Sequence, residues 1–222
     1  MKTYKFIIFL LLVCGCCIHY NSNTKEINQF SIIPISVEEY NTFHKNKERN
    51  LLDTNKIKKI NGKIKIVGID STLSLKDDSM SEEFHINYEY LGYYEIINRH
   101  LVQTVYSEGL KFSLIDAKIK IIEIWNIPIF SEDNKYFACI KPYGIEGEEI
   151  GFQIWKIQNN LDDNSRTNIK IDKIIELSQM QFSPVECFWR DEFLYVKGES
   201  LEIQFYDNPT KTVEQYWKLQ FN

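Results

Sequence analysis

The chain has 222 residues, of which 44% are hydrophobic and 26% are charged, and its formal net charge at pH 7 is −5. This length and composition fit one large or two small globular domains with a packed core. The acidic balance excludes a molecule covered by a basic, phosphate-binding face, so we expect no nucleic acid among its partners.

The first segment has the charge and hydropathy pattern of an export signal. Lys2 and Lys5 precede an uninterrupted apolar run from Phe6 to Val13. This run falls in the range of about 7–15 residues expected for the core of a signal peptide, and it is shorter than the roughly 20 residues of a membrane-spanning helix. The chain turns polar from His19 onward. We therefore predict a signal peptide over residues 1–15 that is removed after export.

A cysteine-rich quartet, Val13-Cys14-Gly15-Cys16, ends this segment. It resembles the lipobox of bacterial lipoproteins, in which an aliphatic residue, a small residue and a glycine precede the cysteine that receives the lipid. The resemblance implies that Cys16 is the lipidated anchor; Cys14 and Cys17 fit the pattern less well. Acyl chains on Cys16 would hold the protein to a bilayer at about 0.8 kcal/mol per buried methylene. We therefore expect a cell-envelope protein that contacts the membrane through an N-terminal lipid and faces the periplasm or the cell surface.

Residues 16–61 are mostly polar and are predicted to form a lipid-anchored linker with one short helix. The sequence SVEE after Pro34 has the spacing of a capping box, in which Ser36 accepts from the backbone amide of Glu39 and the Glu39 side chain reaches back. Residues 45–65 then hold eight basic side chains against two acidic ones. Two interpretations of this stretch stay open: contact with anionic lipid, at about 1 kcal/mol per basic residue, or a solvated face of linker and helix.

From residue 62 to 222 the pattern is that of an antiparallel all-β domain. Alternating or Tyr- and Ile-rich runs, such as KIKIVGID, HINYEYLGYYEII, HLVQTVY and LKFSLID, are separated by short turns. Strand–turn–strand units recur from Gly109, Gly151 and Ser200, and matching positions lie 42 to 58 residues apart. This spacing is close to the length of a four-stranded propeller blade.

Two segments of this region carry a family resemblance. IFSEDNKYFACI, with a turn at Asp133-Asn134, looks like the FSPDGKYLA signature of WD40-like and TolB-like β-propeller blades, and GFQIWKI resembles the I-x-I-W strand that follows it. The resemblance implies antiparallel meander sheets arranged side by side over about residues 84–221. Because about three such units are fewer than the four to eight blades of a closed ring, we expect an incomplete propeller-like stack or a sandwich of meanders, with a short N-terminal helix.

The residues that carry common chemistry lack the required spacing. No HExxH, paired CxxC, GxSxG or glycine-rich phosphate loop is present. The acidic groups around Glu148 and Asp162 lack the alternating ligands of a calcium loop and are expected to be solvated loop tips. We therefore expect no catalytic residue, no metal ligand and no cofactor. The four histidines are His19, His44, His85 and His100.

The loop KPYGIEGEE is the most site-like surface of the β region, because proline and glycine shape a long excursion between two strands. Its candidate binding residues are Lys141, Pro142, Tyr143, Gly144 and Glu146.

Cys139 and Cys187 belong to the body of the protein. In an oxidising envelope compartment they form a disulfide if neighbouring sheets bring their strands together; otherwise they are two small buried hydrophobes.

The aromatic side chains have two possible uses, packing in the core or stacking on sugar rings. The alternation of Tyr88 and Tyr90 fits a face that packs against the core, and we predict core and cross-strand packing as the main use.

These patterns together predict a non-enzymatic lipoprotein of the cell envelope whose β-meander body binds or scaffolds another protein or a glycan. Two alternatives stay open: a hydrolase that attacks an envelope polymer with loop carboxylates, and an immunity-type inhibitory lipoprotein. An enzyme predicts carboxylates, or a histidine and a carboxylate, that converge in a cleft, whereas a binding module predicts an exposed patch.

Overall fold

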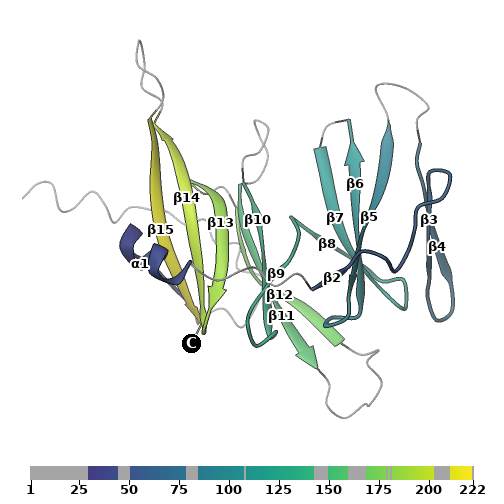
Figure 1. Cartoon of the computed structure of the whole chain (residues 1–222), viewed down its shortest axis with the longest axis horizontal. Coiled ribbons are helices and arrows are strands. Elements are labelled where there is room, and N and C mark those ends of the chain that lie inside the picture. Colours follow the sequence, from purple (N-terminus) through teal and green to yellow (C-terminus); the bar gives the residue numbers. More distant parts are fainter. Residues whose placement is uncertain are drawn as a thin grey trace, which may run out of the picture.

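The computed structural model describes residues 30–44, 51–78, 85–107, 109–142, 150–159, 169–178, 180, 182–202 and 211–221. These residues form four antiparallel sheets and one short helix. The sheets stand side by side as successive layers of an open stack (Figure 1), and the described strands close no sheet into a ring. The predicted all-β architecture of meander sheets with one short helix is confirmed.

The first two layers come from the middle of the chain. A hairpin forms the first layer, with β3 (Lys63–Val67) paired to β4 (Thr72–Lys76). The second layer has five strands in the order β2-β5-β6-β7-β8. Their bounds are β2 (Leu52–Asp53), β5 (Ile86–Tyr94), β6 (Arg99–Tyr106), β7 (Gly109–Asp116) and β8 (Ile121–Ile124).

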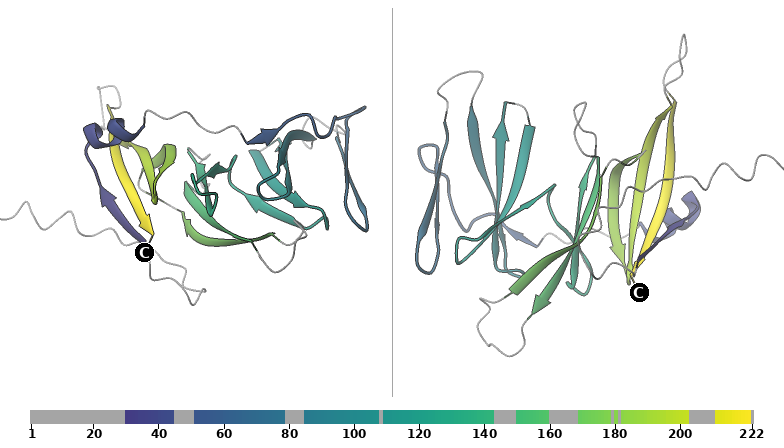
Figure 2. Two further views of the ribbon diagram at one scale, coloured as in Figure 1. Left: turned by 60° about the horizontal axis from the view of Figure 1, so that its bottom comes forward. Right: turned by 180° about the vertical axis from the view of Figure 1, so that it is seen from behind.

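The third and fourth layers have four strands each, in the orders β12-β11-β10-β9 and β1-β15-β14-β13. The third contains β9 (Ile129–Phe130), β10 (Tyr136–Lys141), β11 (Gly151–Asn159) and β12 (Ile169–Leu177). The fourth contains β1 (Phe30–Pro34), β13 (Ser183–Arg190), β14 (Phe193–Glu202) and β15 (Lys211–Phe221). The same order of layers is visible from two further directions (Figure 2).

The turns predicted from aspartate and asparagine are present. Asn134 between β9 and β10 has φ = 61°, and Asp191 between β13 and β14 has φ = 52°. Both values lie in the left-handed region, which Asn and Asp tolerate better than other non-glycine residues. The side chain of Asp133 accepts from the Lys135 amide at 3.0 Å and from the Ser131 hydroxyl at 2.8 Å, which fixes the first of these turns.

Residues 30–34 and 52–53 belong to the β body, which corrects the linker predicted over residues 16–61 at these positions. β1 pairs along its whole length with the C-terminal strand β15, from Phe30↔Phe221 to Pro34↔Trp217, and β2 pairs with β5. Phe30 and Ile32 pack against the core of the fourth sheet. Local composition does not reveal this role because the partner strand lies at the other end of the chain.

Helix α1 (Val37–Phe43) follows β1 and covers the fourth sheet. The Ser36 hydroxyl accepts from the Glu39 amide at 3.2 Å, as predicted for the cap. The Glu39 carboxylate accepts instead from the Lys218 ammonium on β15, at 2.7 Å. One part of the predicted capping box therefore holds the helix start, and the other ties the helix to the sheet.

Three hydrophobic clusters fill the spaces between consecutive layers. The first joins the hairpin to the five-stranded sheet and contains Ile64, Ile66, Val102 and Ile115. The second contains Leu101, Leu114, Phe137, Cys139 and Trp155, among others, and the third contains Ala138, Ile154, Cys187, Leu194 and Leu219, among others. β10 therefore contributes alternate residues to two cores, which explains its unbroken apolar sequence. Tyr94, Trp155 and Trp189 are buried in these cores, in agreement with the predicted use of the aromatic residues.

Candidate functional site

A cleft of about 360 Å³ lies between the five-stranded sheet and the β9–β12 sheet. Its volume is within the range of small-ligand sites, about 300–1,000 Å³. The walls come from β7 and β8 on one side and from β10, β11 and β12 on the other. The lining residues are Leu110, Lys111, Glu123, Ile124, Trp125, Lys141, Gln153, Lys173 and Glu176.

Gln153 is the polar centre of the cleft and is only 3% exposed. Its side-chain oxygen accepts from the backbone amide of Trp125 at 3.2 Å and from the indole Nε1 of Trp155 at 3.3 Å. Its side-chain nitrogen donates to Glu176 Oε2 at 2.7 Å. Because Trp125 follows β8 and Glu176 belongs to β12, this one amide connects both walls.

A β-bulge places the charged groups of β12 in the cleft. The register shifts between Ile154 and Trp155, so that Gln153 is opposite Glu176 whereas Trp155 is opposite Lys173, and Ile174 is the extra residue. Residues three apart on a regular strand point to opposite faces. The extra residue brings Lys173 and Glu176 to the same face, where they form an ion pair.

The other charged groups of the cleft are more exposed. Lys111 on β7 lies 3.8 Å from Glu123 on β8, with side-chain exposures of 55% and 69%. Exposed pairs of this kind contribute about 0–1 kcal/mol. The Lys111 ammonium is therefore free to exchange its weak partner for a ligand group. Leu110, which is 52% exposed, adds an apolar surface beside it.

A buried arginine on the five-stranded sheet connects this sheet to the β9–β12 sheet. Arg99 on β6 is 4% exposed; its NH1 lies 2.9 Å from Asp116 Oδ2 on β7, and its NH2 donates to the Ile169 carbonyl on β12 at 3.3 Å. Burial alone would raise the pKa of the Asp116 carboxyl, but Arg99 and the backbone amides of Lys120 and Lys118 hold it below its ordinary value.

Comparisons of this chain with protein-family models, curated proteins and solved structures found no match. Within the described ranges no helix is both long enough and apolar enough to cross a membrane.

The predicted binding loop contributes in part to the cleft. Lys141, the last residue of β10, is one of the lining residues, and Pro142 follows it directly. Tyr143, Gly144 and Glu146 lie outside the described residues, as do the predicted signal peptide and Cys16.

The disulfide considered for Cys139 and Cys187 is not formed in this structure, where both are buried free thiols. Cys139 packs with Phe137 in the second core, whereas Cys187 packs with Ala138 and Ile140 in the third. Cys139 therefore points from β10 into one core, whereas Cys187 lies in the core on the other face of β10. Burial raises the pKa of the Cys139 thiol above its usual range, as expected for a small hydrophobe in a core.

The sequence did not indicate most of the cleft residues. Lys111, Glu123, Gln153, Lys173 and Glu176 come from four strands of two sheets, and no short motif contains them. The one local signal was the position of Lys141 at the start of a long loop.

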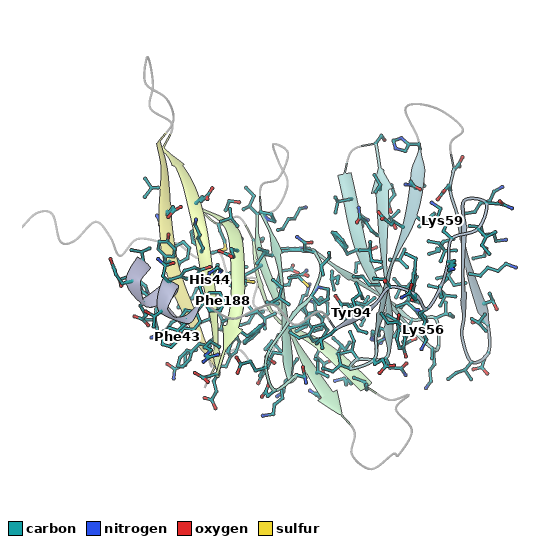
Figure 3. All side chains as sticks on the ribbon, viewed as in Figure 1. Phe43, His44, Lys56, Lys59, Tyr94 and Phe188 are labelled. Carbon is teal, nitrogen blue, oxygen red and sulfur yellow. The ribbon has the colours of Figure 1, made fainter. Side chains whose placement is uncertain are left out.

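A second group of side chains was also not predicted from the sequence. His44 Nε2, at the end of α1, lies 2.7 Å from Glu186 Oε1 on β13, and the Tyr40 hydroxyl donates to Glu186 Oε2 at 3.1 Å. Phe188 contacts the rings of both Tyr40 and His44, each at a centroid distance of 5.2 Å (Figure 3). Tyr40 is 2% exposed, and burial together with Glu186 raises its pKa above the usual range. None of these residues lines the cleft; the group fastens α1 to the sheet.

The two carboxylates of the cleft differ in how firmly they are held. Glu176 accepts from Gln153 and Lys173, and its side chain is 34% exposed. Glu123 has Lys111 beside it at 3.8 Å and is 69% exposed. The cleft therefore has a fixed carboxylate on β12 and a solvent-exposed one on β8.

Proposed function

We propose that this protein is a non-enzymatic lipoprotein of the cell envelope, held to the membrane by a lipid on Cys16, and that its inter-sheet cleft binds a carboxylate-bearing segment of a partner protein. The observation that carries the proposal is the cleft itself, which combines a fixed polar centre at Gln153 with lysines and an exposed apolar residue, Leu110, at its walls.

The charge of the cleft supports an anionic ligand group. Three lysines and two glutamates line it, which gives a formal charge of +1 in a chain whose net charge is −5. Positive charge in a concave site raises the local concentration of anionic ligands and selects against cationic ones. An acidic side chain of a partner, with an apolar neighbour against Leu110, matches this lining.

The side chains of the first wall favour a protein over a glycan. Sugar-binding surfaces present several flat rings to the ligand, but Trp125 is the one aromatic side chain among the lining residues and is half-buried, whereas Trp155 and Trp189 are buried in the cores. The wall formed by β7 and β8 instead carries exposed aliphatic side chains on these strands and just after them. They are Leu110 at 52%, Ile121 at 49% and Ile127 at 46%. Such side chains are suited to contact with another protein.

The blade-like motifs of the sequence are consistent with this proposal. We infer from the resemblance of IFSEDNKYFACI and GFQIWKI to WD40-like and TolB-like blades that the stack is an open relative of such propellers. Fold resemblance transfers no ligand, so the binding assignment depends on the cleft residues alone.

The proposal is tested by capture of partners from native membranes with the tethered full-length protein. The variant Lys111→Glu/Lys173→Glu changes the cleft charge from +1 to −3. The matched control is Lys135→Glu/Lys170→Glu, because these two lysines are also ion-paired, each with an aspartate, but do not line the cleft. We expect the cleft variant to lose capture of its specific partner by about tenfold or more, since like-charge contacts cost several kcal/mol. Equal capture by both variants would refute the cleft as the binding site.

The anchor has a separate test. The intact mass of the mature wild-type protein should show a lipid on Cys16, and Cys16→Ala should remain unlipidated. A wild-type protein that stays soluble with Met1 attached contradicts the lipoprotein assignment.

A further inference from the structure

The outer face of the β3–β4 hairpin combines lysines with the most exposed aliphatic side chains of the described chain. Val67 is 74% exposed, Ile60 is 68% exposed and Ile69 is 57% exposed. On β3 the buried residues Ile64 and Ile66 alternate with outward-facing Lys63, Lys65 and Val67. The hairpin is the last layer at one end of the stack, and no described element lies in front of it (Figure 1).

This end of the molecule is strongly basic although the chain is acidic. Residues 56–78 contain six lysines and three aspartates, which is a formal charge of +3, against −5 for the whole chain. The Lys59 ammonium donates to the Tyr88 carbonyl on β5 at 2.7 Å and lies 2.6 Å from Asp77, which follows β4. The Lys56 ammonium lies 4.2 Å from the centre of the Tyr93 ring; both lysines are labelled in Figure 3. Four lysines of this segment form no ion pair with a described residue: Lys58, Lys63, Lys65 and Lys76.

The register of the hairpin brings these positive charges together. Lys63 is directly opposite Lys76 on the neighbouring strand, and Ile60 is opposite Lys63 through a two-residue turn at Asn61-Gly62. Like charges directly opposite each other destabilise an antiparallel pair. Asn61 and Gly62 have φ of 50° and 68°, which are the values of a tight turn, and this turn places Ile60 opposite Lys63. The fold therefore holds Lys63, Lys65 and Lys76, which form no ion pair with a described residue, on one face beside an exposed isoleucine.

From this arrangement we propose that the outer face of the β3–β4 hairpin is a docking surface for an anionic phospholipid bilayer. A bilayer of this kind offers negative headgroups to Lys63, Lys65 and Lys76, and an apolar boundary to the aliphatic side chains of Ile60 and Val67. Lysines beside inserted aliphatic residues are the pattern by which peripheral proteins bind such surfaces. The proposal is independent of the cleft and of a lipid on Cys16.

The position of the predicted anchor is compatible with this surface. Fourteen residue steps separate Cys16 from Phe30, the first residue of β1, and at about 3.3–3.6 Å each they reach at most about 50 Å. Three core clusters lie between the hairpin and the sheet of β1, one in each space between consecutive layers, and at roughly 10 Å per spacing they correspond to about 30 Å. A lipid on Cys16 and the hairpin face can therefore contact the same membrane.

The test measures vesicle binding of the full chain carrying Cys16→Ala. This substitution excludes any contribution from a lipid attached to Cys16, and residues 1–15 are the same in all variants. Vesicles of phosphatidylcholine are compared with vesicles that contain about one third phosphatidylglycerol, at low and high salt. Lys63→Gln/Lys65→Gln/Lys76→Gln is the hairpin variant. Lys135→Gln/Lys156→Gln/Lys170→Gln, on the β9–β12 sheet, is the control with the same change in charge.

We expect salt-sensitive binding to the anionic vesicles that falls by roughly 100-fold in the hairpin variant and by less than about threefold in the control variant. Val67→Ser should weaken binding at high salt as well, because its contribution is not ionic. An equal loss in both triple variants, or equal binding to neutral and anionic vesicles, would overturn the proposal. Binding of soluble polyglutamate without binding of vesicles would assign the face to an acidic protein instead. A thermal unfolding midpoint at or above that of the parent protein confirms that each variant is folded, because loss of the Lys63–Lys76 repulsion can only raise it.

Discussion

Replacing Gln153 by leucine tests whether the polar centre of the cleft holds its two walls together. The substitution preserves the approximate size of the side chain but removes the acceptor of the Trp125 amide and of the Trp155 indole, and the donor to Glu176. Leaving a buried N–H unpaired costs about 1–3 kcal/mol. The two bonds to the side-chain oxygen are long, at 3.2 and 3.3 Å, so we expect the free energy of unfolding to fall by about 2–4 kcal/mol.

The assay is urea denaturation followed by tryptophan fluorescence. With a slope of about 2 kcal/mol per molar urea, this loss shifts the midpoint downward by roughly 1–2 M. Gln158→Leu is the control, because Gln158 lies on the same strand but does not line the cleft, and surface changes of this kind usually alter stability by less than about 0.5 kcal/mol. Gln153→Glu adds a second test: its carboxyl lies beside Glu176, so this variant should gain stability as the pH falls and one carboxyl is protonated. If Gln153→Leu loses no more stability than Gln158→Leu, the hydrogen-bond network does not support the cleft.

Three further predictions follow from buried groups. Asp116→Asn should lower the free energy of unfolding by about 3 kcal/mol at pH 7, because it breaks the pair with Arg99. The folded-state pKa of Asp116 is lowered from 3.8, so the difference from wild type, measured by urea titration, should shrink as the pH falls below 3.8. A difference that stays constant with pH would contradict the ion pair. Burial, with a smaller effect of Lys56, lowers the pKa of His100 from 6.5 to about 4. The free energy of unfolding of the wild type should therefore decrease as the pH falls from 6.5 to 4, because the unfolded state takes up the proton first. His100→Gln should remove this decrease, whereas His85→Gln should retain it. Reducing agent should leave the thermal midpoint unchanged, because Cys139 and Cys187 are free thiols, and a fall in the midpoint on reduction would show that they pair.

The β character of the chain could be predicted because period-two alternation and turn chemistry are local. The hairpins β7–β8 and β11–β12 match the units predicted from Gly109 and Gly151, and β15 is the second strand of the unit predicted from Ser200. Ser36 caps α1 as its spacing indicated. The small number of blade-like units in the sequence also indicated an open stack instead of a closed ring. Each of these inferences used residues that are close together in the chain.

Features that depend on distant pairing could not be predicted. β1 joins β15 across the length of the chain, and composition alone made that segment look like a linker. The bulge at Ile174 sets which face Lys173 and Glu176 occupy, and no propensity indicates an extra residue. The sequence left open whether Cys139 and Cys187 form a disulfide, because the core that each side chain enters depends on the register of β10 and on the packing of its sheet against β13.

Hydrogen–deuterium exchange of the protein, with and without the partner captured from native membranes, tests the central proposal most directly. A partner in the cleft should slow amide exchange in β8, at Trp125 and in β11 and β12, while the outer strand β1 keeps its rate. If the bound partner slows amide exchange only elsewhere, or nowhere, recognition through the inter-sheet cleft is contradicted.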